Sequence, residues 1–149
     1  MASNERLYVI FRLGVEDFGL EINKIKEIIV FRETTNVPGS GELIEGIINL
    51  RGQVIPIFNL RRKFALPIVE YSRNTRMVVV EISGHTVGIV VDGVSKVMVI
   101  TEDVIEKPSS LITAKVDSNY ISGVAKLGEK LVILLSLDRV LNIEATEAV

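Results

Sequence analysis

Apolar and polar positions alternate along the chain in short runs that end at polar or glycine-containing turns. In the N-terminal half, residues 8–13 and 18–22 flank such a turn, and in the C-terminal half residues 77–82 and 87–91 do the same. Short alternating runs bounded by turn residues are typical of β-strands joined as hairpins. The pattern therefore predicts a mainly β protein with little helix.

Residues 45–60 are the most informative stretch, because two apolar runs flank the four residues Leu-Arg-Gly-Gln. Gly52, at the third turn position, supplies the positive φ that a tight hairpin turn requires. Arg51 is thereby placed at the tip of a hairpin. We expect Asn49 and Gly52 to be structural turn residues. Turns are normally polar, so a solvated Arg51 without a role is the ordinary interpretation of this position alone.

The composition supports the β prediction. Hydrophobic residues make up 48% of the 149 positions and aromatic residues only 5%. Valine and isoleucine carry the apolar share, and β-branched side chains lose little freedom in strands. The positive mean hydropathy of so short a chain also indicates more apolar surface than one core can hide, which favours contact with partners.

An internal repeat divides the chain into two similar halves of about 70 residues. Residues 18–28 align with 87–97, and residues 46–64 align with 123–141, with glycines and apolar positions largely in step. Each half is expected to form a small five-stranded barrel, because closure removes exposed sheet edges. We expect a single domain over residues 1–149, made of two intertwined β-barrel halves.

Only short helical segments are predicted. Residues 59–63 suit a helical turn that ends before Pro67, and residues 136–141 suit the start of a C-terminal helix with Ser136 as its cap. Pro56 cannot donate to a sheet ladder, so its strand is expected at an edge or a bulge.

Charge and composition exclude several classes of protein. A net charge of −2, a pI near 5.5 and the lack of a Lys/Arg run argue against nucleic acid or an anionic membrane as ligand. The chain has no cysteine, which excludes disulfides and thiol chemistry. No apolar run approaches the roughly 18 residues of a membrane helix. We therefore expect a cytoplasmic protein without direct membrane insertion.

No constellation of residues nominates an active site. His85 is the single histidine and is predicted in a solvated turn, so it cannot build a metal site alone. The glycine spacing over 88–93 lacks the Lys-Ser/Thr that a phosphate loop requires. Asp17, Asp92 and Asp103 are scattered among turns and form no acid and base pair. The sequence predicts a protein that is not an enzyme and holds no metal or cofactor.

The two halves of the repeat differ at two charged positions. Arg51 aligns with Gly128, and Glu27 aligns with Lys96. A binding site that exists at one place only would leave such a difference, although ordinary drift explains either exchange equally well. An arginine at a turn tip can bind carbonyls or a carboxylate through its planar fork.

The segment 46–60, with its Asn-Leu-Arg-Gly run, resembles the signature of CheW-type chemotaxis coupling proteins. Residues 8–13, 18–28, 87–94 and 131–138 resemble further blocks of that family, in order, across nearly the whole chain. The resemblance implies two five-stranded SH3-like β-barrel subdomains packed together, with short helical turns. It also implies a non-enzymatic scaffold that couples the cytoplasmic tips of chemoreceptors to the regulatory domain of the chemotaxis histidine kinase CheA, in arrays beneath the membrane.

The same resemblance implies the contact residues. The receptor tip would lie in the groove between the barrels, at Glu27, Ile28, Arg51 and Val94. The kinase would contact an apolar edge of one barrel, at Val9, Ile22 and Ile25. Burial in the chain's own core is an equally open interpretation for these three apolar residues.

A small β-barrel module that binds peptides or nucleic acid is the alternative function. The acidic pI and the lack of an aromatic strip for base stacking count against nucleic acid. An enzyme, the third class, lacks candidate residues.

Overall fold

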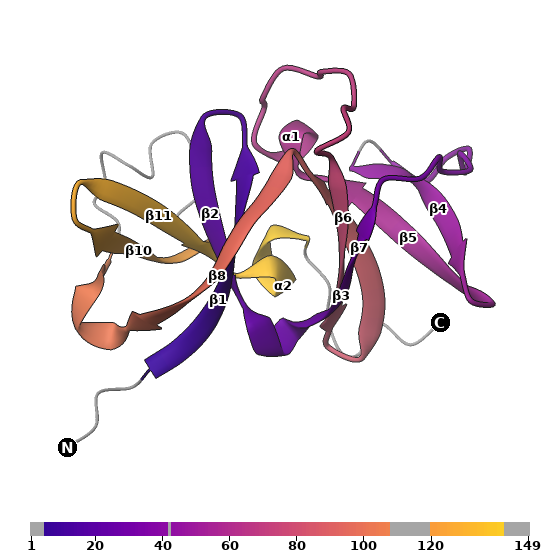
Figure 1. Cartoon of the computed structure of the whole chain (residues 1–149). Helices are drawn as coiled ribbons and strands as arrows, with labels where there is room; N and C mark the ends of the chain where they lie inside the picture. Colours follow the sequence, from indigo (N-terminus) through magenta and orange to yellow (C-terminus); the bar gives the residue numbers. More distant parts are fainter. Residues whose placement is uncertain (1–4, 42, 108–119, 142–149) are drawn as a thin grey trace.

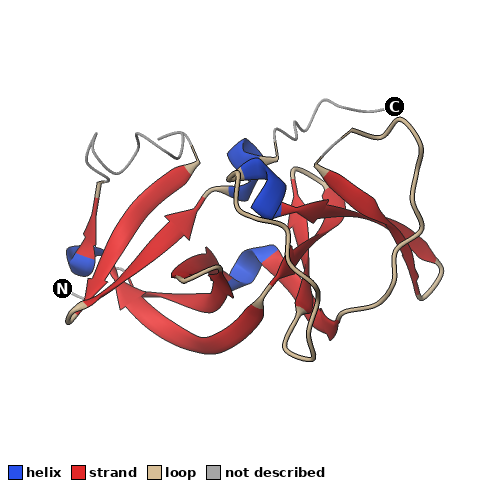
Figure 2. Cartoon of the chain, turned by 90° about the horizontal axis from the view of Figure 1, so that it is seen from above, coloured by secondary structure: helices blue, strands red, loops and turns tan. Residues whose placement is uncertain are grey.

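The computed structural model describes residues 5–41, 43–107 and 120–141 (Figure 1). The N-terminal half contributes β1 (Glu5–Leu13), β2 (Glu16–Glu21), the 3-10 turn η1 (Ile22–Lys24), β3 (Ile25–Val30), β4 (Ile44–Leu50), β5 (Gln53–Asn59) and α1 (Leu60–Lys63). The C-terminal half contributes β6 (Arg76–Ile82), β7 (His85–Val91), β8 (Gly93–Thr101), η2 (Glu102–Val104), β9 (Ile105–Glu106), β10 (Ile121–Leu127), β11 (Lys130–Leu135) and α2 (Leu137–Val140). The mainly β prediction is confirmed, and Figure 2 shows how few residues are helical.

The strands form two curved sheets, and each sheet makes up one of two β-barrel subdomains that pack side by side. Sheet A has the order β8-β1-β2-β11-β10-β9, and sheet B has the order β3-β6-β7-β5-β4. Each sheet therefore takes strands from both halves of the chain. The prediction that each half closes into its own barrel is wrong, because the strand pattern identifies strands but does not say which of them pair.

The parallel pairings between the halves explain two of the repeated glycines. Gly88 of β7 lies beside Ile57 of β5, and a Cβ at Gly88 would come within 2.6 Å of the Ile57 Cδ1. Gly19 of β2 lies beside Leu134 of β11, where a Cβ would come within 2.9 Å of the Leu134 Cδ2. Ile57 and Leu134 are themselves aligned in the repeat. The two subdomains thus use the same close approach at matching places.

Sheet B closes on itself through the segment that follows β3. The Thr35 amide donates to the Ile47 carbonyl at 2.8 Å, and the Ile47 amide donates back to the Thr35 carbonyl at 2.9 Å. Gly46 lies at this seam, since a Cβ there would approach the Thr35 carbonyl oxygen to 2.7 Å. In the other subdomain the aligned Gly123 makes an equally close approach, 2.5 Å from its Cβ position to the Ile105 Cγ2.

Three apolar clusters hold the fold together. One fills sheet B and includes Ile57 and Met77, and a second fills sheet A and includes Ile10. The third lies between the sheets and combines side chains of β1, β2, β6, β7, β11, α1 and α2, among them Phe11 and Val78. Burial of a large apolar side chain contributes about 1.5–3 kcal/mol, so this central cluster joins the subdomains into one unit.

The helical turns lie at aligned positions but are capped differently. The predicted helical turn at 59–63 is confirmed as α1, and the Asn59 side chain caps it by accepting a hydrogen bond from the Arg61 amide at 2.9 Å. Ser136 occupies the N-cap position of α2, but its hydroxyl donates to the Asp138 carboxylate at 2.7 Å and makes no cap bond. The predicted Ser136 cap is therefore wrong in its bonding. The remainder of the expected C-terminal helix lies outside the described residues.

Pro56 departs from the expected edge position. Its strand, β5, lies inside sheet B between β7 and β4. The fold tolerates the proline because β5 pairs with β7 only from Ile57 to Asn59, so Pro56 precedes that pairing.

Candidate functional site

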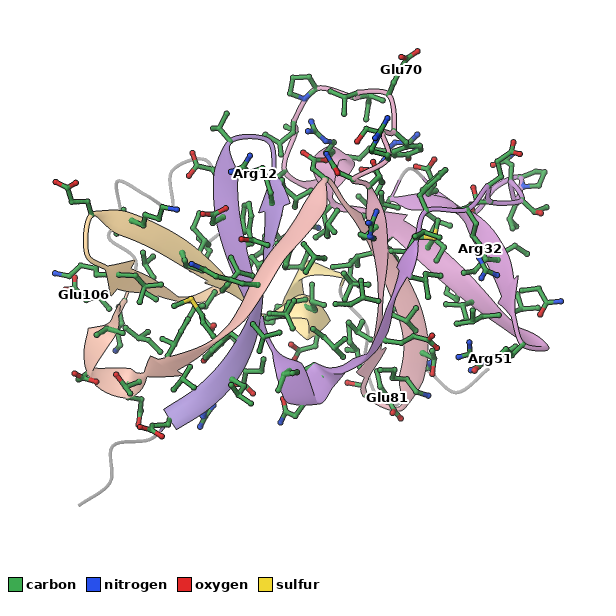
Figure 3. All side chains as sticks on the ribbon, in the orientation of Figure 1. Arg12, Arg32, Arg51, Glu70, Glu81 and Glu106 are labelled. Carbon is green, nitrogen blue, oxygen red and sulfur yellow. The ribbon has the colours of Figure 1, made fainter. Side chains whose placement is uncertain are left out.

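The tip of the β4–β5 hairpin is joined to β3 by an ion pair. The Arg51 Nη2 donates to the Glu27 Oε1, and Figure 3 shows Arg51 at the far end of the hairpin. β3 and β4 are the two outer strands of sheet B, so the pair crosses the seam where this barrel closes. The hydrogen bond to Glu27, and then its charge, raise the pKa of Arg51. The two charged positions that distinguish the halves of the repeat are thus brought together.

The turn itself explains how Arg51 reaches Glu27. Arg51 has a φ of 52° and Gly52 a φ of 89°, so both central residues adopt the left-handed conformation typical of a type I′ turn. The sequence predicted this conformation for Gly52 alone. The Gly52 amide donates to the Asn49 Oδ1 at 2.9 Å, and the Arg32 Nη1 donates to the Asn49 carbonyl at 3.2 Å.

Solvent reaches both members of the ion pair. The Arg51 side chain is 70% exposed and that of Glu27 31%. A shallow hollow of about 160 Å³ beside them is lined also by Gln53 and Thr86. The next residue along β3, Ile28, is exposed as well, but consecutive residues of a strand face opposite sides of the sheet, so its side chain lies on the other face from Glu27. An exposed ion pair of this kind contributes little to stability and leaves both charges available to a partner.

Val94 lies in the other subdomain from the ion pair. It is a half-buried residue of β8 in sheet A and packs against the central cluster. It also lines a separate hollow of about 370 Å³ together with Arg12, Arg76 and Asp92. The structure therefore groups Glu27, Ile28 and Arg51 on one subdomain and places Val94 on the neighbouring one.

The three predicted kinase contacts are not equivalent. Val9 is only 2% exposed, and its strand β1 lies between β2 and β8. It is therefore a core residue, and its predicted contact with the kinase is wrong. Ile22 is exposed and lies in η1. Ile25 is half-buried against the central cluster. They do not share one barrel edge, because the chain passes from sheet A to sheet B at η1.

Sequence reasoning missed an ion pair between α1 and the start of β8. Asp92 accepts from the Arg61 Nε at 3.1 Å and from the Arg61 Nη2 at 2.5 Å. The partners are separated by 31 positions in the sequence, so no local pattern indicates the contact. The one available signal was that Asp92 interrupts a long apolar run.

The described residues offer no metal centre, since none of their His, Cys, Asp and Glu side chains gather in groups of three or more. His85 is the first residue of β7 and pairs with Ile82, so its expected place in a solvated turn is wrong. The helices seen in this part of the chain are too short to cross a membrane.

Comparison with known proteins gives a consistent family. The CheW-like domain model matches residues 7–145. The chain is 37% identical over 137 residues to the Chemotaxis protein CheW of Klebsiella aerogenes, covering 92% of this chain and 82% of that protein. It is 28% identical over 148 residues to the CheW of Treponema pallidum, covering 95% and 86%. The crystal structure of the scaffolding protein TtCheW from Thermoanaerobacter tengcongensis superposes with a TM-score of 0.86 at 33% identity, over 98% of this chain and 94% of that one.

The chain belongs to the CheW-like family, and it shares its two-subdomain β fold with the TtCheW crystal structure. The family and the names of the relatives support a scaffold role in chemotaxis, which agrees with a non-catalytic protein.

Proposed function

We propose that the chain is an adaptor that couples chemoreceptors to the regulatory domain of the histidine kinase CheA, in arrays on the cytoplasmic side of the membrane. Membership of the CheW-like family supports this role. The observation that carries it is the Arg51–Glu27 pair, an exposed charged contact formed at positions where the other half of the repeat has Gly128 and Lys96.

The receptor contact in this proposal consists of Glu27, Ile28 and Arg51 on sheet B, with Val94 on sheet A. The Arg51 fork can hold a carboxylate or a backbone carbonyl of the receptor, and Glu27 keeps the fork oriented. Ile28 adds exposed apolar contact area on the other face of β3.

The kinase contact in this proposal is apolar and includes Ile22 and Ile25. Ile22 exposes 38% of its surface at η1, and Ile25 lies at the start of β3. Since the contact relies on aliphatic surface, its affinity should depend weakly on salt.

The proposal is tested by titrating the protein separately with a receptor cytoplasmic fragment and with the CheA regulatory domain, using calorimetry. Saturable binding of both, and of both at once, is the expected result. Failure of the folded protein to bind either one would overturn the coupling function. A thousandfold loss of kinase affinity at high salt would overturn the apolar account of that contact.

A further inference from the structure

The chain crosses between the two sheets at two places among the described strands. It passes from sheet A to sheet B at η1, between β2 and β3, and it returns at Asp92, between β7 and β8. The repeat aligns these crossings, since residues 18–28 correspond to 87–97 and Asn23 corresponds to Asp92. The relative placement of the subdomains depends on how each crossing is held.

Asp92 is held from both sheets. Its carboxylate accepts two hydrogen bonds from Arg61 of α1, which follows directly on β5 of sheet B, at 3.1 and 2.5 Å. The same carboxylate accepts from the Gly14 amide, in the β1–β2 turn of sheet A, at 2.7 Å. The Asp92 amide donates to the Arg12 carbonyl of β1 at 2.9 Å. The Arg61 Nη1 also donates to the Pro67 carbonyl at 2.6 Å, which fixes the guanidinium in turn.

We refer to the Arg61–Asp92 pair, with its contacts to both sheets, as the clamp. It is more deeply buried than the ion pair of Arg51 with Glu27. The Arg61 side chain is only 12% exposed and that of Asp92 27%, compared with 70% for Arg51. A two-point arginine–carboxylate contact restricts both position and angle, and a partly buried one is only weakly screened by salt. Loss of one partner would leave the other charge uncompensated.

The aligned crossing at η1 lacks this clamp. In the alignment of the repeat, Asn23 occupies the position of Asp92 and Asp138 occupies the position of Arg61. An amide and a carboxylate cannot form an ion pair. The Asp138 carboxylate instead accepts a hydrogen bond from the Ser136 hydroxyl of its own turn, at 2.7 Å. The repeat therefore carries the clamp on one side only.

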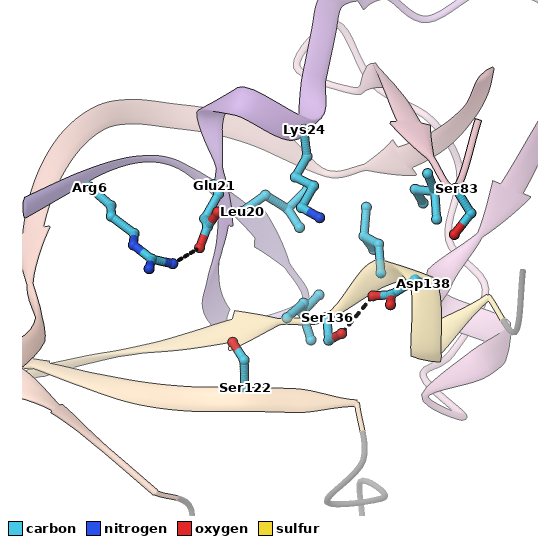
Figure 4. Close-up of a pocket in the computed structure, with 11 residues that line it drawn as sticks. Arg6, Leu20, Glu21, Lys24, Ser83, Ser122, Ser136 and Asp138 are labelled. Atoms are coloured by element: carbon cyan, nitrogen blue, oxygen red, sulfur yellow. Dashed lines mark hydrogen bonds and ion pairs between the residues drawn. The ribbon is translucent and has the colours of Figure 1, made fainter. Parts of the chain in front are cut away.

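A cavity of about 400 Å³ opens at the unclamped crossing (Figure 4). Its walls come from both subdomains: Leu20 and Ser122 belong to sheet A, whereas Ser83 follows β6 of sheet B. Lys24 of η1 and Asp138 of α2 also line it. A hollow of about 370 Å³ also adjoins Asp92, so the two crossings differ in their polar contacts and not in the space beside them.

We propose that the Arg61–Asp92 pair is a positioning device that sets the orientation of the two subdomains, with the clamped crossing as the fixed point and the η1 crossing as the adjustable one. Any partner that contacts both subdomains then meets a surface whose geometry depends on this pair, although neither residue touches the partner. For a receptor that contacts Arg51 on one side and Val94 on the other, this consequence rests on the proposed function.

The orientation can be measured on the protein alone by electron–electron double resonance. The chain has no cysteine, so Gln53→Cys in sheet B and Glu129→Cys in sheet A provide two unique, exposed labelling sites. Asp92→Asn keeps the size of the side chain but removes its charge, and Arg61→Lys keeps a charge but not the two-point contact. Asp138→Asn, at the position aligned with Arg61, is the matched control.

Both clamp variants are expected to broaden the distribution of distances between the labels, and Asp138→Asn is expected to keep the width of the parent protein. Parent-like distributions in folded Asp92→Asn and Arg61→Lys would overturn the proposal, as would equal broadening in Asp138→Asn. If Asp92→Asn does not fold, Arg61→Lys alone decides between these outcomes. Should Arg61→Lys fail to fold as well, the clamp is required for folding and the positioning role is overturned. Because no partner is present, the result does not depend on whether receptors bind.

Discussion

Arg51, in the β4–β5 turn, and Glu27, on the outer strand β3, lie 24 residues apart in sequence and meet across the seam of the sheet B barrel. Arg51 makes this contact from a left-handed backbone conformation, with a φ of 52°. Both charges remain accessible to solvent. They are therefore suited to exchange part of their mutual contact for contact with a partner.

Arg51→Ala is expected to weaken receptor binding while kinase binding and the melting temperature change little, because the side chain is exposed. Receptor and kinase titrations, together with thermal melts, measure the three quantities. Lys96→Ala, at the position aligned with Glu27, is the control and should leave receptor binding intact. A joint loss of stability and of both interactions would assign Arg51 to holding the barrel seam.

Ile22→Asp is expected to lower affinity for the CheA regulatory domain without unfolding the protein, since Ile22 is 38% exposed. Val9→Asp provides the contrast: a charge at a residue that is 2% exposed should unfold the protein. Circular dichroism melts and kinase titrations separate the two effects. An Ile22→Asp protein that binds the kinase like the parent would remove η1 from the contact surface.

Gly46→Ala is expected to destabilise the protein by about 1–3 kcal/mol, the usual cost of overpacking. A Cβ at this position would lie 2.6 Å from the Thr34 Oγ1 and 2.7 Å from the Thr35 carbonyl oxygen, at the seam of sheet B. Gly93→Ala is the control, because its nearest contact would be an ordinary 3.6 Å. Urea unfolding of both variants gives the comparison, and equal stabilities would contradict the proposed close packing.

Stability is expected to fall as the pH rises above about 10, partly through Tyr71. Burial, and then a hydrogen bond with Glu45, raise the pKa of Tyr71 above its ordinary value of 10.0. The unfolded chain therefore loses this proton at a lower pH than the folded chain does, so the stabilisation present below pH 10 is lost at higher pH.

Tyr71→Phe tests this dependence. It keeps the ring contact with Phe31, whose centroid lies 4.1 Å from that of Tyr71, but removes the ionising hydroxyl. Urea midpoints measured across the alkaline range should therefore decline less steeply in the variant. Identical slopes in the two proteins would exclude a contribution from Tyr71.

The sequence alone determined the features that depend on neighbours along the chain. Alternating apolar positions located most strands, Gly52 located the hairpin tip, and the run 59–63 located α1. Each of these follows from backbone conformation or from hydrogen bonds within a few residues. The Asn-Leu-Arg-Gly segment also indicated the family, which the comparisons confirm.

Only the tertiary structure decided which strands pair and which side chains meet. The pairings of β2 with β11, of β5 with β7 and of β1 with β8 join strands from the two halves. The β1–β8 pairing places the buried Val9 between β8 and β2, and the β5–β7 pairing precedes the contact of Arg61 with Asp92. A period of two tells which residues share a face of a strand, but every strand of a β-rich chain offers similar backbone donors and acceptors to many neighbours. The choice among those neighbours is made by packing over long separations in sequence, which no local pattern records.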